Sequence, residues 1–477
     1  MKEDSARPDS QSLSPAAIKP RSYHVHPPRA ELVAIGKELR SKCPRKSHAD
    51  WTRPHGRPSA VQLVKQSDHG RIPELVPIRH GRMLQSPFSF YRGAALNMAA
   101  DLACSPATGL YVQTCGDAHL VNFRGFATAE RRLIFDIHDL DETLPAPWEW
   151  DLKRLATSFV LASRENGFDD VRGAEAARAC AQSYREHVIA YSKMRVLDVW
   201  YSSIGLEELL PTVRDGKFRD RLLKRVDKEQ QRCTLEYDFP KLAHTVNGAS
   251  VLRDNPPTIF HFHRKFGKDE FQSIIRKSFE GYRNSLPPAR HALLDHYDFK
   301  DVAIKVVGVG SVGTFCAVVL LMAGPADPLF LQIKEARASV LEPYAGKSVF
   351  ANHGQRVVNG HHMMQSASDI FLGWSTGKAV VQNFYVRQLR DMKIKPIVEN
   401  FSSTDMITFA EWCGWTLARA HSRNGEPAVM GGYMGKSEAF DEAISGFAIA
   451  YANQTERDYE SVKKAASQGK LEVVMER

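Results

Sequence analysis

The sequence has no uninterrupted apolar run that approaches the roughly eighteen residues of a membrane-spanning helix, so we predict no membrane span. The first twenty residues are polar and rich in proline, and they lack the apolar core of a signal peptide. Paired cysteines are missing too, because the seven cysteines are scattered and none belongs to a C-x-x-C pair. An odd, dispersed set argues for reduced thiols and against a disulfide framework or structural zinc. We therefore expect a cytoplasmic protein.

Neither positive nor negative charge is concentrated enough in the sequence to indicate a particular partner. The net charge of +9 is spread along the chain, and its densest basic stretches lie near the N-terminus and over residues 217–232. A solvated surface accounts for this, and nucleotide phosphates would suit it equally well. No specific nucleic-acid motif is present, and the sequence indicates no protein partner.

Length and periodicity divide the chain into parts. With 477 residues we expect two or three domains. We predict a disordered tail over residues 1–28, a mainly helical large lobe over 29–300, a small β-rich lobe over 301–400, and C-terminal helices over 401–477 that return to the large lobe. Within the large lobe, we expect residues 71–90 to be extended, because prolines and glycines interrupt them.

A stretch of apolar and acidic residues carries the strongest chemical signal. Asp117 and Asn122 stand five residues apart after an apolar, strand-like run. In a protein-kinase catalytic loop, an Asp accepts the proton of the substrate hydroxyl and an Asn five residues later holds a metal ion. A second apolar run then ends in acids, of which Asp136 can supply the metal-binding Asp, with Asp139 and Asp141 as alternatives.

Two further polar residues, His119 and Asp151, could serve the fold instead of the chemistry. His119 follows the candidate base by two residues and could position a phosphate or the Asp, or it could be a packed polar residue. The whole loop could also be a turn that Asp and Asn side chains cap. Asp151 opens the next predicted helix, where we expect a structural role as its N-cap.

Three glycines mark a candidate phosphate-binding turn. Gly308, Gly310 and Gly313 fit the pattern G-x-G-x-x-G. A dinucleotide-binding fold would continue into a helix, but residues 314–322 are a β-branched run that predicts a strand. A strand, a Gly-rich turn and a second strand are how a kinase covers ATP phosphates, with backbone groups such as that of Ser311 close to the phosphate. The alternative is a tight hairpin without a ligand.

Lys334 stands within the apolar strand-like sequence FLQIKEA. Burying a Lys is costly unless an anion pairs with it, and the kinase Lys that contacts ATP phosphates and an acidic helix residue satisfies that need. Glu342 is the candidate acidic partner, and Glu335 is an alternative. A strand-edge Lys that extends to water remains the non-functional interpretation.

The order of these parts is reversed relative to an ordinary kinase. The Asp117 loop precedes the Gly-rich turn by nearly two hundred residues. A circular permutation reconciles them, with the helix over residues 410–421 returning the chain to the large lobe. We therefore predict an α+β, protein-kinase-like two-lobed fold, circularly permuted, with a large helical lobe and a small antiparallel-sheet lobe that binds nucleotide.

Longer motifs support a family resemblance. From about residue 30 to 470 the sequence resembles an uncharacterised bacterial family, domain of unknown function 2252, through RHGRMLQSPFSFYRGAA, TCGDAHLVNF, FDIHDLDETLPAPWEWDLKRLA, VVGVGSVGT, FLQIKEA and FYVRQLRDMK. More distantly, GDAHLVN, LIFDIHD and PWEWDLKRLA are similar to the G-D-x-H-x-x-N loop, the metal-binding strand end and the D-L-A helix of aminoglycoside phosphotransferases and choline kinases. This second resemblance implies that Asp117 is the base, that Asn122 and Asp136 bind Mg²⁺, and that Lys334 binds phosphate. Cys115 departs from it, because those kinases usually have His there.

Three functions are compatible with these patterns. The first is an ATP- and Mg²⁺-dependent phosphotransferase acting on an unidentified hydroxyl acceptor, with nucleotidyl transfer as a variant. The second is a metal-dependent phosphohydrolase that uses Asp117, His119, His138 and Asp139 as a metal cluster. The third is a catalytically silent, nucleotide-binding interaction module.

Overall fold

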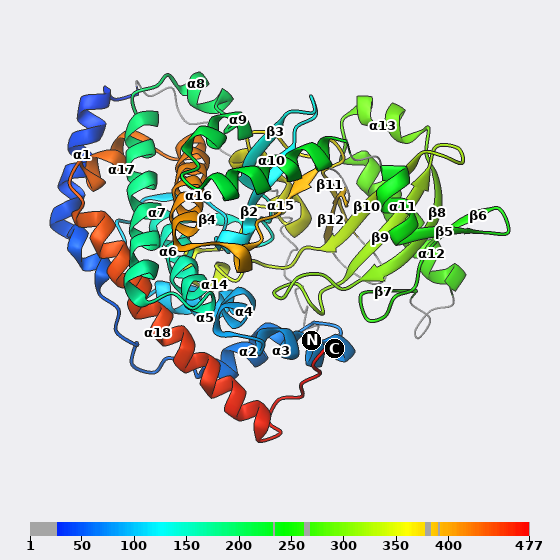
Figure 1. Cartoon of the computed structure of the whole chain (residues 1–477), viewed down its shortest axis with the longest axis horizontal. Coiled ribbons are helices and arrows are strands. Elements are labelled where there is room, and N and C mark those ends of the chain that lie inside the picture. Colours follow the sequence, from blue (N-terminus) through cyan, green and yellow to red (C-terminus); the bar gives the residue numbers. More distant parts are fainter. Residues whose placement is uncertain (1–25, 232–233, 262–267, 377–382, 390–391, 477) are drawn as a thin grey trace, which may run out of the picture.

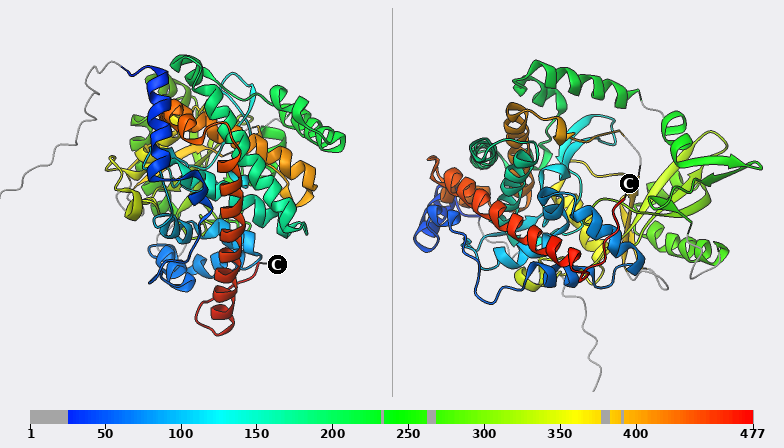
Figure 2. Two further views of the ribbon diagram at one scale, coloured as in Figure 1. Left: turned by 90° about the vertical axis from the view of Figure 1, so that its left-hand side faces the viewer. Right: turned by 60° about the horizontal axis from the view of Figure 1, so that its bottom comes forward.

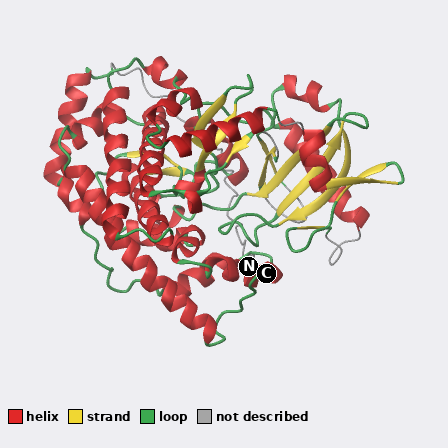
Figure 3. Cartoon of the chain, in the orientation of Figure 1, coloured by secondary structure: helices red, strands yellow, loops and turns green. Residues whose placement is uncertain are grey.

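The computed structural model describes residues 26–476 except for 232–233, 262–267, 377–382 and 390–391. The tail predicted over residues 1–28 therefore lies almost entirely outside the described residues. Figures 1 and 3 show the described chain as a mixed α+β protein, with most helices gathered on one side and the main sheet on the other.

The helical side is built from long helices that pack along one another. α18 runs along the outside of this side as one long helix (Figure 2), and it packs on α6 and α7, while α16 packs on α7. None of the described helices is both long and apolar enough to cross a membrane. The helices of this side are α1 (Arg29–Lys42), α2 (Ala60–Asp68), α3 (Val76–Met83), α4 (Pro87–Gly93), α5 (Ala95–Leu102), α6 (Trp148–Glu165), α7 (Asp170–Tyr191), α8 (Val196–Tyr201), α9 (Leu206–Leu209), α10 (Gly216–Gln230), α14 (Glu342–Ala345), α16 (Ser403–Asn424), α17 (Pro427–Met434) and α18 (Ala439–Ser467).

The main sheet has six antiparallel strands in the order β11-β12-β10-β9-β8-β7. Its central strands are β-branched and apolar, and both faces of β9 are buried, so the sheet is covered on both sides. Its strands are β7 (Ile259–Phe260), β8 (Asp298–Lys305), β9 (Cys316–Met322), β10 (Pro328–Glu335), β11 (Gly373–Ser375) and β12 (Phe384–Gln388); the helices α11 (Phe239–Leu242), α12 (Lys268–Asn284), α13 (Pro288–Leu294) and α15 (His353–Met364) accompany them. Because β7 and β8 belong to it, the sheet begins before the boundary expected at residue 301.

Three smaller sheets complete the structure. β1 pairs with β4, β5 pairs with β6, and the third sheet has the order β13-β2-β3. The strand β13 follows β12 in sequence yet pairs with β2 beside the helical side, so the chain returns there before α16 begins. These strands are β1 (Tyr111–Thr114), β2 (Phe123–Ala127), β3 (Leu133–Ile137), β4 (Leu144–Pro147), β5 (Ala243–Val246), β6 (Ala249–Leu252) and β13 (Lys393–Ile394).

The expectation of an extended segment over residues 71–90 is wrong, because α3 and α4 occupy most of it. Pro77 and Pro87 each stand in the first turn of one of these helices. A proline there gives up only an N–H that has no partner within the helix, and its fixed φ suits the helix start. The prolines therefore begin helices here instead of preventing them.

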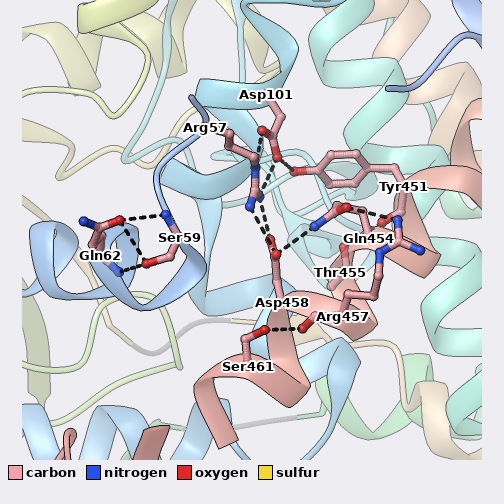
Figure 4. A network of polar contacts seen from close by, with 10 residues as sticks. All are labelled: Arg57, Ser59, Gln62, Asp101, Tyr451, Gln454, Thr455, Arg457, Asp458 and Ser461. Carbon is pink, nitrogen blue, oxygen red and sulfur yellow. Dashed lines mark hydrogen bonds and ion pairs between the residues drawn. The ribbon is translucent and has the colours of Figure 1, made fainter. Parts of the chain in front are cut away.

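A buried ion network fixes the chain before α2 to the helical side (Figure 4). The guanidinium of Arg57 lies 2.6 Å from Asp101 on α5 and 2.6 Å from Asp458 on α18. Tyr451 also donates a hydrogen bond to Asp101, and Gln454 donates one to Asp458. Burial raises the pKa of Asp101, and its bonds to Arg57 oppose that rise.

We expect Arg57→Ala to lower the free energy of unfolding by about 3–5 kcal/mol, because two buried carboxylates would lose their cation. Chemical denaturation of the full chain measures this loss. Arg172→Ala is the matched control, since Arg172 pairs with Glu175 on the exposed surface of α7 and its removal should leave the transition unchanged. A similar effect of both substitutions would contradict the prediction.

Candidate functional site

The loop after β1 is held in a conformation that requires glycine. Gly116 has a φ of 80°, and a Cβ there would lie 2.3 Å from the main-chain oxygen of Glu142. A larger residue would therefore clash with the chain that enters β4. This turn directs Asp117 away from the strand and leads into the 3₁₀ turn Leu120–Asn122.

One face of α6 holds this loop. The Asp151 carboxylate accepts hydrogen bonds from the main-chain N–H groups of Cys115 and Gly116 at 2.6 and 2.9 Å. One turn later on the same face, Arg154 pairs with Asp117 at 2.5 Å. The role predicted for Asp151 was an N-cap, but α6 begins at Trp148, so Asp151 supports the loop from inside the first turn.

Asp117 and Asn122 both line one cavity. The Asn122 amide donates a 2.9 Å hydrogen bond to the main-chain oxygen of Asp117, which leaves its amide oxygen available to a ligand. The Asp117 side chain is 21% exposed. Burial raises the pKa of Asp117, and the Arg154 guanidinium opposes that rise.

Lys334 reaches across from the main sheet to the acidic segment after β3. Its Nζ lies 2.5 Å from Asp141 and 3.3 Å from Asp139, and Tyr385 on β12 donates a further hydrogen bond to Asp141. Burial disfavours the charge on Lys334, but the two carboxylates outweigh it and hold its pKa well above the usual range. Burial likewise opposes ionisation of Asp139, and Lys334 and Arg387 nevertheless hold its pKa well below its ordinary value.

The Gly-rich turn between β8 and β9 contributes to the same cavity through Gly310 and Ser311. The other two glycines serve the turn itself. Gly308 and Gly313 have φ values of 63° and 85°, and their main-chain oxygens accept hydrogen bonds from Arg82 at 2.6 Å and from the N–H of Ile72 at 2.7 Å. Residues of the 71–93 segment therefore hold the turn against the helical side.

The Asp117 loop, the acidic segment and the Gly-rich turn line one cavity of about 290 Å³. Lys334 does not line it, but it pairs with two carboxylates that do, those of Asp139 and Asp141. Both acids and arginines line it, so the cavity offers groups for both a cation and an anion. Arg92 is the notable cation, because its Nε is buried without a hydrogen-bond partner and its side chain has no ion pair to a described residue. The residues relevant to chemistry that line the cavity are Arg71, Arg79, Arg92, Asp117, Asn122, Asp139, Asp141, Glu142, Gly310, Ser311, Glu335 and Arg337.

The cavity does not include Asp136, which the sequence favoured as a metal ligand. Asp136 is fully buried, pairs with Arg419 on α16 at 2.6 Å, and accepts two hydrogen bonds from Ser366. Its carboxylate oxygens are thus occupied inside the protein. The alternative, Asp139, lies three residues later and does face the cavity.

Three further candidates, Glu342, His119 and His138, lie outside this cavity, whereas Glu335 lines it. The Glu342 carboxylate lies 3.7 Å from the His353 ring, so its neighbour is His353 and not the predicted Lys334. Glu335 accepts a hydrogen bond from the N–H of Phe315. His119 is buried outside the lining of the cavity; burial, aided by nearby Arg92, holds its pKa well below its usual range. His138 lines a different cavity from Asp139, so the cluster proposed for a phosphohydrolase is not assembled.

We expect Asp136→Asn to lower the free energy of unfolding by about 3–5 kcal/mol, because it would leave the buried Arg419 without its anion. Asp139→Asn is the matched comparison. Asp139 is 31% exposed and Lys334 keeps Asp141 as a partner, so its replacement should have a much smaller effect on folding. Urea denaturation of both variants tests the distinction, and an equal loss would contradict it.

Sequence reasoning missed Arg92 and Arg154. Arg92 lies on the largely buried helix α4, and Arg154 lies on α6, where every residue from Trp148 to Ser163 is buried. The signal for Arg154 was its spacing of three residues from Asp151, which puts both side chains on one face of α6. For Arg92 no local pattern distinguishes a residue that faces a cavity from one that faces water.

A metal ion would find a partial set of ligands in this cavity. Among the described residues, no group of three His, Cys, Asp or Glu side chains is arranged to hold a metal ion. Mg²⁺, however, is typically bound by one or two carboxylates together with water and substrate phosphates. The Asp139 carboxylate and the Asn122 amide oxygen fit that donor set.

A comparison with protein families finds one matching model, described as an uncharacterised protein conserved in bacteria (DUF2252), over residues 71–465. The match covers more than half of the chain. The chain belongs to this family. No curated protein and no solved structure matches it significantly. The DUF2252 match spans the loop of Asp117, the Gly-rich turn and Lys334, and it includes all lining residues of the cavity except Gln66 and Ser67.

Proposed function

We propose that this DUF2252 protein is an ATP- and Mg²⁺-dependent phosphotransferase with a circularly permuted, protein-kinase-like fold. One observation carries the proposal: Lys334 from the main sheet contacts Asp139, and Asp139 lines a single cavity together with Asp117 and the Gly-rich turn. A kinase uses a Lys, a metal-binding Asp, a base and a Gly-rich turn together in this way.

The order of elements in the main sheet supports the likeness to protein kinases. The Gly-rich turn joins β8 to β9, Lys334 stands on the third strand, β10, and α15 then precedes β11 and β12. In protein kinases too, the Gly-rich turn precedes the strand that bears the Lys, and helix αC follows that strand. The return of the chain through β13 to α16, where His421 contacts Asp151 at 3.2 Å, supports a permuted connection to the loop.

One departure from kinases concerns the partner of the Lys. Kinases pair it with a Glu of helix αC, but α15 contains no acidic residue, and Arg356 of α15 donates hydrogen bonds to the main-chain oxygens of Asp141 and Thr143. Asp139 and Asp141 take the place of that Glu. Nucleotide phosphates would therefore compete with Asp141 for Lys334, while Asp141 keeps its hydrogen bond from Tyr385.

The remaining roles follow from position in the cavity. Asn122 and Asp139 would hold Mg²⁺, which supplies charge neutralisation between the phosphates when bound. Arg92 would hold a phosphate or an anionic part of the acceptor by charge-assisted hydrogen bonds. Asp117 would orient the acceptor hydroxyl and accept its proton, while Arg154 keeps the carboxylate in place. The buried free thiols, such as Cys115 and Cys413, support a reducing, cytoplasmic setting.

Nucleotide products distinguish the possible reactions. The protein is incubated with Mg²⁺·ATP and a panel of sugars and amino alcohols, and the nucleotides are separated by chromatography. We expect ADP to form only when an acceptor is present, with a mass gain of one phosphoryl group on that acceptor. AMP with pyrophosphate would indicate nucleotidyl transfer, and ATP binding without any product would favour a silent nucleotide-binding module.

A further inference from the structure

A second cavity lies behind the acidic segment that carries Asp139. It has a volume of about 180 Å³ and is enclosed by the β2–β3 hairpin, by α15 and the residues after it, and by the end of β12. No described residue lines both cavities. His138 lines this second cavity, while Asp139, the next residue in the chain, lines the first.

An unpartnered histidine faces this cavity. His138 is only 9% exposed, yet its ring has no hydrogen bond or ion pair to any described residue, and its closest ring contact is an edge-on one with Phe126 at 6.2 Å. Burial of polar groups without partners is unfavourable, and most buried polar side chains are therefore satisfied. The imidazole nitrogens of His138 are thus free to bond with a ligand in the cavity.

Charged residues of both signs line the cavity. Arg131, Arg387 and Lys393 provide three cations, and Asp369 provides one carboxylate. That carboxylate is engaged by the main chain, because it accepts hydrogen bonds from the N–H groups of Phe371 and Gln388. Arg131 and Lys393 also interact with other groups, so Arg387 is the cation of this lining that we assign to a ligand.

Arg387 is held in position by the protein. Its Nε donates to Gln332 Oε1 at 3.2 Å, and its Nη1 donates to the main-chain oxygen of His138 at 3.2 Å. Neither acceptor carries a charge, and Arg387 lines the cavity. A fixed guanidinium loses little conformational freedom when it binds a carboxylate or phosphate.

Volume and lining limit the size of the ligand. A volume of about 180 Å³ corresponds to roughly six water molecules. Ile370, Leu372 and Phe126 supply an apolar part of the wall. We propose that this cavity is a binding site for a small organic anion, in which Arg387 and His138 bind a carboxylate or phosphate and the apolar wall contacts the rest of the molecule.

Isothermal titration of the full chain without nucleotide or Mg²⁺ tests the site. The probes are benzoate and phenyl phosphate, with acetate and inorganic phosphate as the matching head groups alone. We expect one of the aromatic probes to bind with one-to-one stoichiometry, and its identity distinguishes a carboxylate site from a phosphate site. Its affinity should fall at least about tenfold in His138→Phe and in Ile370→Glu, which remove a hydrogen-bonding ring and add a negative charge.

Two controls locate the binding. His362→Phe makes the same change at an exposed neighbour of the cavity-lining His361 on α15, and Arg92→Gln alters the first cavity. Both should bind the probe as the wild type does. Circular dichroism verifies that each variant is folded, and His138→Phe decides the matter if Ile370→Glu does not fold. Absence of binding to the wild type, equal binding by His138→Phe, or loss of binding in Arg92→Gln would each overturn the proposal.

Discussion

Replacing Asp117 with Asn is expected to lower the rate of phosphoryl transfer by about 10²–10⁴-fold, the range typical of losing a general base. An amide cannot accept the acceptor's proton, although its oxygen can still accept a hydrogen bond from Arg154. Asp117 pairs with Arg154, whereas Lys334 pairs with Asp139 and Asp141, so we expect the affinity for Mg²⁺·ATP to be unchanged.

The rate of ADP formation and the nucleotide affinity are measured on the same preparation. Asp169→Asn is the control, because Asp169 is the exposed N-cap of α7 and Asn serves equally well in that role. A rate for Asp117→Asn within about threefold of the control, at equal stability, would contradict the assignment of a base to Asp117.

Replacing Lys334 with Met is expected to weaken Mg²⁺·ATP binding by about tenfold or more, since hydrogen bonds to charged groups contribute about 1.5–3 kcal/mol. Methionine retains an unbranched apolar stem within β10 but removes the cation. The substitution also leaves Asp139 and Asp141 without their shared partner, which places two negative charges near the phosphates. Both effects act in the same direction.

Lys300→Met provides the control for Lys334→Met. Lys300 stands on β8 of the same sheet, its side chain is 38% exposed, and it pairs with Asp298 at 3.0 Å. Titration calorimetry should give this variant the wild-type affinity. Equal affinities for all three proteins would show that Lys334 does not contact the nucleotide.

The sequence predicts the main sheet, the Asp117 loop and the Gly-rich turn because those parts depend on local patterns. The β-branched runs of β9 and β10 are separated by turn residues, and a strand with a single Lys requires an anion wherever it is buried. The family assignment, too, rests on long motifs and is confirmed by the match over residues 71–465. The contribution of β7 to the sheet was not predictable, since a two-residue strand has no periodicity.

The choice between Asp136 and Asp139 depends on packing that the sequence does not contain. Every residue of β3 is buried, so alternation of polar and apolar residues could not reveal which way Asp136 points. Its partner, Arg419, is nearly three hundred residues away in sequence. Likewise, the interaction of Lys334 with Asp139 and Asp141 joins segments about two hundred residues apart in the sequence. Glu342, which is nearer in the sequence, was therefore predicted as the partner of Lys334, but it lies beside His353.

The most direct test of the proposed nucleotide site is titration of ATP into the full wild-type chain, with and without Mg²⁺. We predict saturable binding of one ATP per chain, with a dissociation constant below about 1 mM in Mg²⁺, since enzymes commonly have KM values of that order or lower. Binding should weaken when Mg²⁺ is chelated and when Lys334 is replaced by Met. A folded protein that shows no saturable binding of Mg²⁺·ATP would contradict the proposal that this cavity binds a nucleotide.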